Sequence, residues 1–94
     1  MTKPYHFYSK LSKYAKEVSA VTLNNLALLY VEMRDLKEAD KVFAECTEML
    51  EDVLGEKHKM LIPFLENYTS TLEQMKRQQE AAALRRRIKV LHSQ

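Results

Sequence analysis

The sequence repeats itself at a spacing of 42 residues, and this spacing restricts the possible folds more than any other feature. Each copy contains a segment of periodic apolar residues, a short polar turn and a second such segment. Repeat proteins show this self-similarity because each unit buries its apolar side only against its neighbours. The residue pairs that the shift superimposes are Leu23 with Leu65, Asn25 with Asn67, Tyr30 with Leu72, Glu38 with Glu80, and Ala39 with Ala81.

Helices are the expected elements in both copies. The chain has one glycine and two prolines among 94 residues, too few for the tight turns of a protein built from β-hairpins. Apolar residues recur at steps of three and four, which is the period of a helix. We therefore expect an all-α fold of about four or five helices, formed by residues 5–13, 20–33, 36–54, 60–75 and 81–91.

Local signals mark the ends of these helices. Asp35 precedes the second long helix and Glu38 follows three residues later, an arrangement that caps helix N-termini. Gly55 follows Leu54 directly, where a helix commonly ends in a left-handed residue. Pro63 is tolerated near the first turn of the next helix, because its missing N–H would have no partner there.

The first copy carries a specific combination of residues. Thr22–Tyr30 reads TLNNLALLY, and Lys37–Ala39, Phe43 and Cys46 follow it. This combination resembles the tetratricopeptide repeat, and in particular the 42-residue variety found in kinesin light chains. The copy departs from the family pattern at Arg34, where the family favours glycine.

The resemblance implies a right-handed α-solenoid of tandem antiparallel helix pairs that forms a single domain, residues 1–94. Residues 1–15 would be the end of a preceding repeat, residues 16–57 the first repeat, and residues 58–94 the second repeat with its terminal helix. Arg85 stands where an aromatic residue is usual, which fits a terminal helix whose outer side meets water. Because stable arrays usually need three or more repeats, we expect a homo-oligomer or membership of a larger complex.

The resemblance also implies a partner-binding groove lined by the first helix of each repeat. In the family an asparagine often bonds the ligand backbone there, and it matches Asn25 and Asn67. An amide suits this task because it offers both a donor and an acceptor. The alternative is that the two asparagines only cap or bridge neighbouring helices. The residues predicted to bind the partner are Asn24, Asn25, Leu28, Val31, Glu32, Asn67, Ser70, Glu73 and Gln74.

The predicted groove is partly apolar, through Leu28 and Val31, and partly acidic, through Glu32, Glu66 and Glu73. Charge complementarity therefore favours a basic or amphipathic peptide or helix as the partner. The chain would then be a protein–protein interaction module, an adaptor or a scaffold. The alternative function is a structural subunit that uses its apolar sides for self-association or for assembly into a larger complex.

Arg85, Arg86 and Arg87 form the densest basic cluster of the chain. Three consecutive arginines fan out around a helix instead of forming one face, and no aromatic residues alternate with them for base stacking. The chain is also nearly neutral, with 15 basic and 13 acidic residues. Nucleic acid is therefore not the expected partner, and weak binding of RNA or another polyanion through this cluster is a minor alternative.

No group of residues predicts catalysis or metal binding, so we expect no enzyme, no metal and no cofactor. The three histidines are scattered, and the single cysteine, Cys46, lies on an apolar stripe where a small buried residue is expected. The apolar run at residues 26–31 is far shorter than the roughly 20 residues of a membrane span, and no export signal is present. We therefore expect a cytoplasmic protein without a membrane partner.

Overall fold

Four α-helices and one short 3-10 helix make up residues 13–94, the part of the chain that this computed structural model describes. No strand occurs within that range, so the expected all-α fold is confirmed. The predicted end of a preceding repeat lies mostly in residues 1–12, outside the described residues. The elements are α2 (Lys13–Glu32), α3 (Leu36–Leu54), η1 (Lys59–Leu61), α4 (Ile62–Gln74) and α5 (Gln78–His92).

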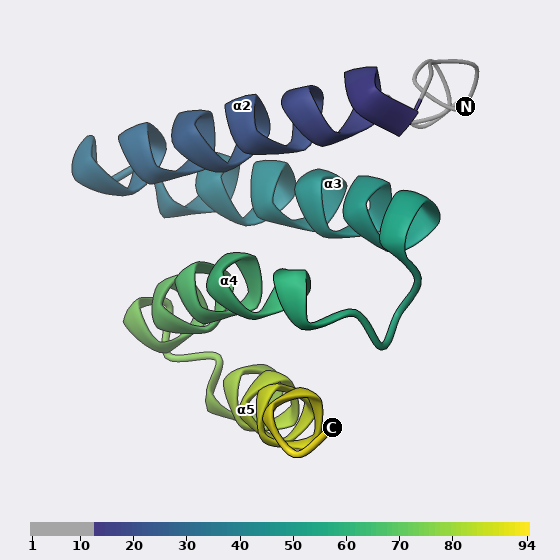
Figure 1. The fold of residues 1–94 in the computed structure, drawn as a ribbon. Helices are drawn as coiled ribbons and strands as arrows, with labels where there is room; N and C mark the ends of the chain where they lie inside the picture. Colours follow the sequence, from purple (N-terminus) through teal and green to yellow (C-terminus); the bar gives the residue numbers. More distant parts are fainter. Residues whose placement is uncertain (1–12) are drawn as a thin grey trace, which may run out of the picture.

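The helices form two consecutive pairs. Figure 1 shows α2 at the top with α3 antiparallel beneath it, α4 beneath α3 and α5 beneath α4. The first pair occupies residues 13–54 and the second pair residues 62–92. Helix α2 begins at Lys13, a few residues before the predicted start of the first repeat at residue 16.

The turns within the two pairs have the same backbone geometry at positions 42 residues apart. Arg34 and Lys76 both have positive φ angles, 63° and 62°. In each turn the next residue donates its N–H to a carbonyl five residues earlier: Asp35 to Tyr30 at 2.9 Å and Arg77 to Leu72 at 2.9 Å. These bonds satisfy carbonyls at the end of the first helix of each pair. The sequence repeat is therefore also a repeat of backbone conformation.

The predicted end signals lie at the helix ends, but the capping box forms only in part, because the Asp35 N–H donates to the Tyr30 carbonyl and not to Glu38. The Asp35 carboxylate accepts a hydrogen bond from the Glu38 backbone N–H at 3.4 Å. Gly55 ends α3 with a φ angle of 88°, and its N–H donates to the Glu51 carbonyl at 2.9 Å. Pro63 lies in the first turn of α4.

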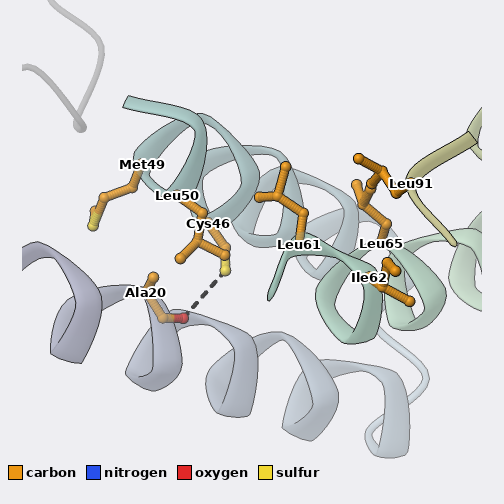
Figure 2. Packing of buried hydrophobic residues seen from close by; sticks show 8 residues of the cluster. All are labelled: Ala20, Cys46, Met49, Leu50, Leu61, Ile62, Leu65 and Leu91. Atoms are coloured by element: carbon orange, nitrogen blue, oxygen red, sulfur yellow. Dashed lines mark hydrogen bonds between the residues drawn. The ribbon is translucent and has the colours of Figure 1, made fainter. Parts of the chain in front are cut away.

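Small residues let the helices approach each other closely, and large residues fill the space around them. Figure 2 shows one core cluster, where the Cys46 thiol of α3 donates to the Ala20 carbonyl of α2 at 3.1 Å. A second cluster lies around Phe43, with Tyr30 packed against it. The buried residues of the first cluster are Ala20, Cys46, Met49, Leu50, Leu61, Ile62, Leu65 and Leu91, and those of the second are Ala27, Ala39, Val42 and Phe43.

The two repeats are joined mainly through α3 and α4. The rings of Phe43 and Tyr68 stack with their centroids 5.6 Å apart. The Tyr68 hydroxyl donates to the Asp40 carboxylate at 2.9 Å, and Arg77 donates to the same carboxylate at 2.7 Å. Apolar stacking and a charged network therefore lie side by side at the junction of the repeats.

Candidate interaction surface

The predicted binding residues lie on α2 and α4, the first helices of the two repeats. Helix α2 carries Asn24, Asn25, Leu28, Val31 and Glu32, and α4 carries Asn67, Ser70, Glu73 and Gln74. Of these nine side chains, the exposed ones are Asn25, Leu28, Glu32, Ser70 and Gln74, and the others are partly buried. Because residues 25, 28 and 32 are spaced by three and four, they share one side of α2. The equivalent residues of α4 are 67, 70 and 74.

The two asparagines predicted to bond the ligand backbone, Asn25 and Asn67, have different surroundings. The Asn67 amide donates to the Asn24 side-chain oxygen at 3.2 Å, and both residues are partly buried. This bond ties the first helices of the two repeats to each other. Asn25 is exposed, and no hydrogen bond joins its side chain to any described residue. The bridging alternative thus describes Asn67, whereas ligand binding by Asn25 stays a prediction.

A hollow of about 550 Å³ opens between α4 and α5. It contains Ser70 and Glu73 of the predicted site, together with α5 residues that the sequence did not assign to the binding groove. Glu73 forms an ion pair with Arg85 across this hollow. The lining residues are Glu66, Thr69, Ser70, Glu73, Arg85, Ile88, Lys89, His92 and Ser93.

A signal for the exposed polar residues of α5 in this hollow was present in the sequence. The 42-residue shift lays Arg85 on Phe43 and His92 on Leu50. Phe43 and Leu50 are buried, whereas Arg85 and His92 are exposed. Where the second repeat has a polar residue and the first repeat has a core residue, that side of α5 is not covered by a further repeat in the described chain.

Two of the three consecutive arginines, Arg85 and Arg87, form ion pairs within the chain. Arg85 pairs with Glu73, and Arg87 pairs with Glu51 at 2.5 Å and also donates to the Glu56 carbonyl at 3.1 Å. These partners lie on different elements, which agrees with the expected fanning of the three side chains. The ion pairs reduce the positive charge that the cluster presents to a polyanion.

The Cys46 thiol and the half-buried Tyr68 hydroxyl stay protonated at neutral pH. Burial raises the pKa of the Cys46 thiol to about 12, so the thiolate needed by a nucleophile or a metal ligand is suppressed. Burial and the hydrogen bond to Asp40 raise the pKa of Tyr68 above its ordinary value.

Residues 13–94 hold no group of three or more His, Cys, Asp or Glu side chains placed to bind a metal ion. No helix in the same range is both long and apolar enough to cross a membrane.

Comparison with known proteins agrees with this architecture. Among curated proteins and among solved structures, no sequence matches the chain significantly. A family model of the tetratricopeptide repeat matches residues 18–87, which is more than half of the chain and spans both helix pairs. The chain belongs to the tetratricopeptide repeat family.

Proposed function

We propose that the chain is a protein–protein interaction module, an adaptor or scaffold, that binds a peptide or helix along the first helices of its repeats. Tetratricopeptide repeats are non-catalytic modules that generally mediate protein–protein interaction. The observation that carries the proposal is a strip of exposed side chains on α2, which we name the groove strip. It consists of Val21, Asn25, Leu28 and Glu32.

The groove strip combines the three kinds of contact that a peptide site needs. Val21 and Leu28 are 50% and 37% exposed, so a ligand would remove apolar surface from water at both positions. Asn25 offers a donor and an acceptor to the ligand backbone. Glu32 supplies a negative charge at the end of the strip.

The charges of the same region favour a basic or amphipathic ligand. Glu73 is neutralised by Arg85, which leaves Glu32 in the strip and Glu66 on α4 as exposed acidic side chains of the predicted groove. Exposed carboxylates of this kind steer an approaching ligand and select its charge more than they raise the affinity. An acidic C-terminal tail is therefore a poor candidate, and a lysine- or arginine-containing amphipathic segment fits better.

The location and the chemistry of the chain form part of this proposal. We place this module in the cytoplasm, since its single thiol is buried and no disulfide is available to stabilise the chain. We also infer that the module has no enzymatic activity of its own. The minor alternative, polyanion binding through Arg85, Arg86 and Arg87, is disfavoured by the ion pairs of two of these arginines.

The test is a binding screen with an array of basic and amphipathic 15-residue peptides, followed by fluorescence polarisation with the best ligand. We expect Asn25→Ala and Leu28→Glu to weaken binding about tenfold or more, equivalent to about 1.4 kcal/mol. Val90→Glu is the matched control, because Val90 is exposed and apolar but lies on α5. Equal loss of affinity in Leu28→Glu and Val90→Glu, or no loss in either α2 variant, would contradict the proposed site.

A further inference from the structure

The hollow between α4 and α5 contains no residue of the groove strip, and it has a counterpart in the first repeat. The 42-residue shift lays its α4 wall on α2 and its α5 wall on α3, so the counterpart is the space between α2 and α3. Helix α4 occupies that space: the Asn67 amide donates to Asn24 of α2, and Tyr68 stacks on Phe43 of α3. The hollow therefore has the position of a helix-binding site, but no helix among residues 13–94 occupies it.

The lining of the hollow includes a surface on which an apolar side chain can rest. Ile88 is partly buried and packs against the first core cluster. Thr69 is 6% exposed, and its hydroxyl donates to the Leu65 carbonyl at 2.7 Å, so it needs no further partner. Ile88 and Thr69 are the counterparts of Cys46 and Ala27, which are both buried in the first repeat. The volume of about 550 Å³ lies within the range of about 300–1,000 Å³ that is usual for ligand sites.

The charged lining residues divide between the two walls. The acidic Glu66 and Glu73 belong to α4, whereas the basic Arg85 and Lys89 belong to α5. Glu73 and Arg85 pair with each other, so their charges cancel. The side chains of Glu66 and Lys89 are exposed and have no partner among residues 13–94. A ligand in the hollow therefore meets one unpaired carboxylate on the α4 side and one unpaired ammonium on the α5 side.

The position of Glu66 predicts a basic side chain on an occupying helix. Glu66 is the counterpart of Asn24, which accepts the hydrogen bond from Asn67 at the junction of the repeats. The residue of an occupying helix that is equivalent to Asn67 would therefore face Glu66. A lysine or arginine there would form an ion pair with the carboxylate, in place of the bond between two amides.

The position of Lys89 predicts an acidic side chain three residues earlier on the same helix. Helices α3 and α4 run antiparallel (Figure 1), so Phe64, one turn before Tyr68, lies level with Thr47, one turn after Phe43. Phe64 also packs against the first core cluster, to which α3 contributes. Thr47 is the counterpart of Lys89. An aspartate or glutamate at the equivalent of Phe64 would therefore face the Lys89 ammonium.

Neither a second copy nor residues 1–12 supplies this pair of charges. A second copy stacked head to tail would place Asn25 and Thr22 of its α2 at the two positions, and both side chains are neutral. Residues 1–12 contain no aspartate or glutamate, so they offer no opposite charge to Lys89. They also precede α2, which lies on the opposite side of the molecule from α5 (Figure 1). Charge complementarity therefore favours a helix from another protein.

We propose that the hollow binds an amphipathic helix of a partner protein, whose carboxylate pairs with Lys89 and whose lysine or arginine, three residues later, pairs with Glu66. An apolar side chain between the two charges rests on Ile88. The groove strip selects a ligand by apolar surface and one negative charge, whereas the hollow requires both signs in a fixed order. That order gives the site a direction and lets it reject helices in which the basic residue comes first.

The first experiment compares two helical probes that differ only in the order of their charges. Both have the sequence of residues 59–75 of this chain, the template that fills the counterpart of the hollow, and a cross-link on the solvent side holds them helical. The matched probe carries Phe64→Glu and Asn67→Lys, and the reversed probe carries Phe64→Lys and Asn67→Glu. In fluorescence anisotropy with the full chain, we expect the matched probe to bind about tenfold more tightly, because two attractive contacts become repulsive in the reversed probe.

The second experiment reverses the charges of the protein. In the double variant Glu66→Lys, Lys89→Glu, the reversed probe should bind about tenfold more tightly than the matched probe. The control is Glu56→Lys, Lys57→Glu, which interchanges two exposed charges outside the hollow and should keep the wild-type preference. Circular dichroism checks that both double variants remain helical.

Four results would overturn the proposal. Equal affinities of the two probes for the wild type would show that the charges do not select the ligand. A Glu66→Lys, Lys89→Glu variant with the wild-type preference would place the probe elsewhere, and loss of the matched probe in Leu28→Glu would place it on the groove strip. The fourth is failure of both probes to bind; if sedimentation then shows a dimer that the Glu66→Lys, Lys89→Glu variant loses, a second copy occupies the hollow.

Discussion

The Asp40 carboxylate is the most informative single group to remove, because it joins three helices at the junction of the repeats. It belongs to α3 and accepts hydrogen bonds from Tyr68 of α4 at 2.9 Å and from Arg77, the residue that precedes α5, at 2.7 Å. Asp40→Ala removes both bonds while leaving the helix propensity of α3 intact or improved. We expect the variant to be destabilised through the junction alone.

The expected loss follows from the exposure of the partners. Hydrogen bonds to charged groups contribute about 1.5–3 kcal/mol each. The side chains of Asp40 and Arg77 are 23% and 33% exposed, so water replaces part of the lost hydrogen bonding. Arg77 also keeps its two bonds to Glu80 at 2.6 Å. The loss of stability is therefore smaller than the sum of two such hydrogen bonds. The free energy of unfolding should therefore fall by about 2 kcal/mol in Asp40→Ala and by about 1 kcal/mol in Tyr68→Phe.

Urea unfolding followed by far-ultraviolet circular dichroism measures this loss. With the denaturant sensitivity usual for a small domain, 2 kcal/mol corresponds to a midpoint lowered by roughly 1 M. Glu80→Ala is the matched control, because this carboxylate also binds Arg77 but is largely exposed; it should leave the free energy of unfolding close to that of the wild type. The double variant Asp40→Ala, Tyr68→Phe should be less destabilised than the sum of the single variants.

A spectroscopic titration gives an independent reading of the same contact. Burial and the bond to Asp40 both raise the pKa of Tyr68, so Asp40→Ala should lower that pKa while Glu80→Ala leaves most of the shift. The reasoning would be refuted if Asp40→Ala and Glu80→Ala lost equal stability. It would also be refuted if the stability of Asp40→Ala stayed within 0.5 kcal/mol of the wild type, which is about the smallest difference that such measurements resolve.

Three further changes test the backbone and the core. Lys76→Gly should raise the free energy of unfolding by about 0.5–1 kcal/mol in urea titrations, since it relieves a left-handed residue whose φ angle is 62°. Gly55→Ala should lower it by about 1 kcal/mol in the same assay; the added Cβ meets no atom within 4 Å, so a larger loss would contradict a purely backbone effect. Because the Cys46 pKa is raised from 9.0 to about 12, the folded state holds this proton more tightly, and stability should be lost as pH rises above 9. The loss should be about 1.4 kcal/mol at pH 10 and absent in Cys46→Ala, which is less stable at pH 7 but has a flatter pH profile between 9 and 12.

The helices and their ends were predictable because their causes are local. The Asp35 cap, the glycine at position 55 and the proline at position 63 each act within one turn of the backbone, and all three lie where the sequence placed them. Periodic apolar residues likewise identified Phe43 and Cys46 as core residues, and both are about 1% exposed. The start of α2 was less predictable: the helix begins at Lys13, whereas the apolar periodicity predicted a helix from residue 20.

The candidate site was predictable only as a set of positions on α2 and α4. Residues 42 apart have equivalent places in their own repeats, but their neighbours differ wherever one repeat has a covering layer and the other has none. Thus Asn25 is exposed while Asn67 bonds to Asn24, and Leu29 is exposed while Thr71 is buried. Whether the exposed positions bind a partner stays a prediction, as does the resemblance to the kinesin light chain variety of the repeat.

The sequence by itself determined the helices, their pairing into repeats and the side of α3 that enters the core. These properties follow from backbone bonding and from apolar periodicity, which act over a few residues. Only the tertiary structure decided which polar side chains meet across the repeats, such as Asp40 with Arg77 and Arg85 with Glu73. The tilt and separation of packed helices set these contacts, and both depend on how the whole core fills its space.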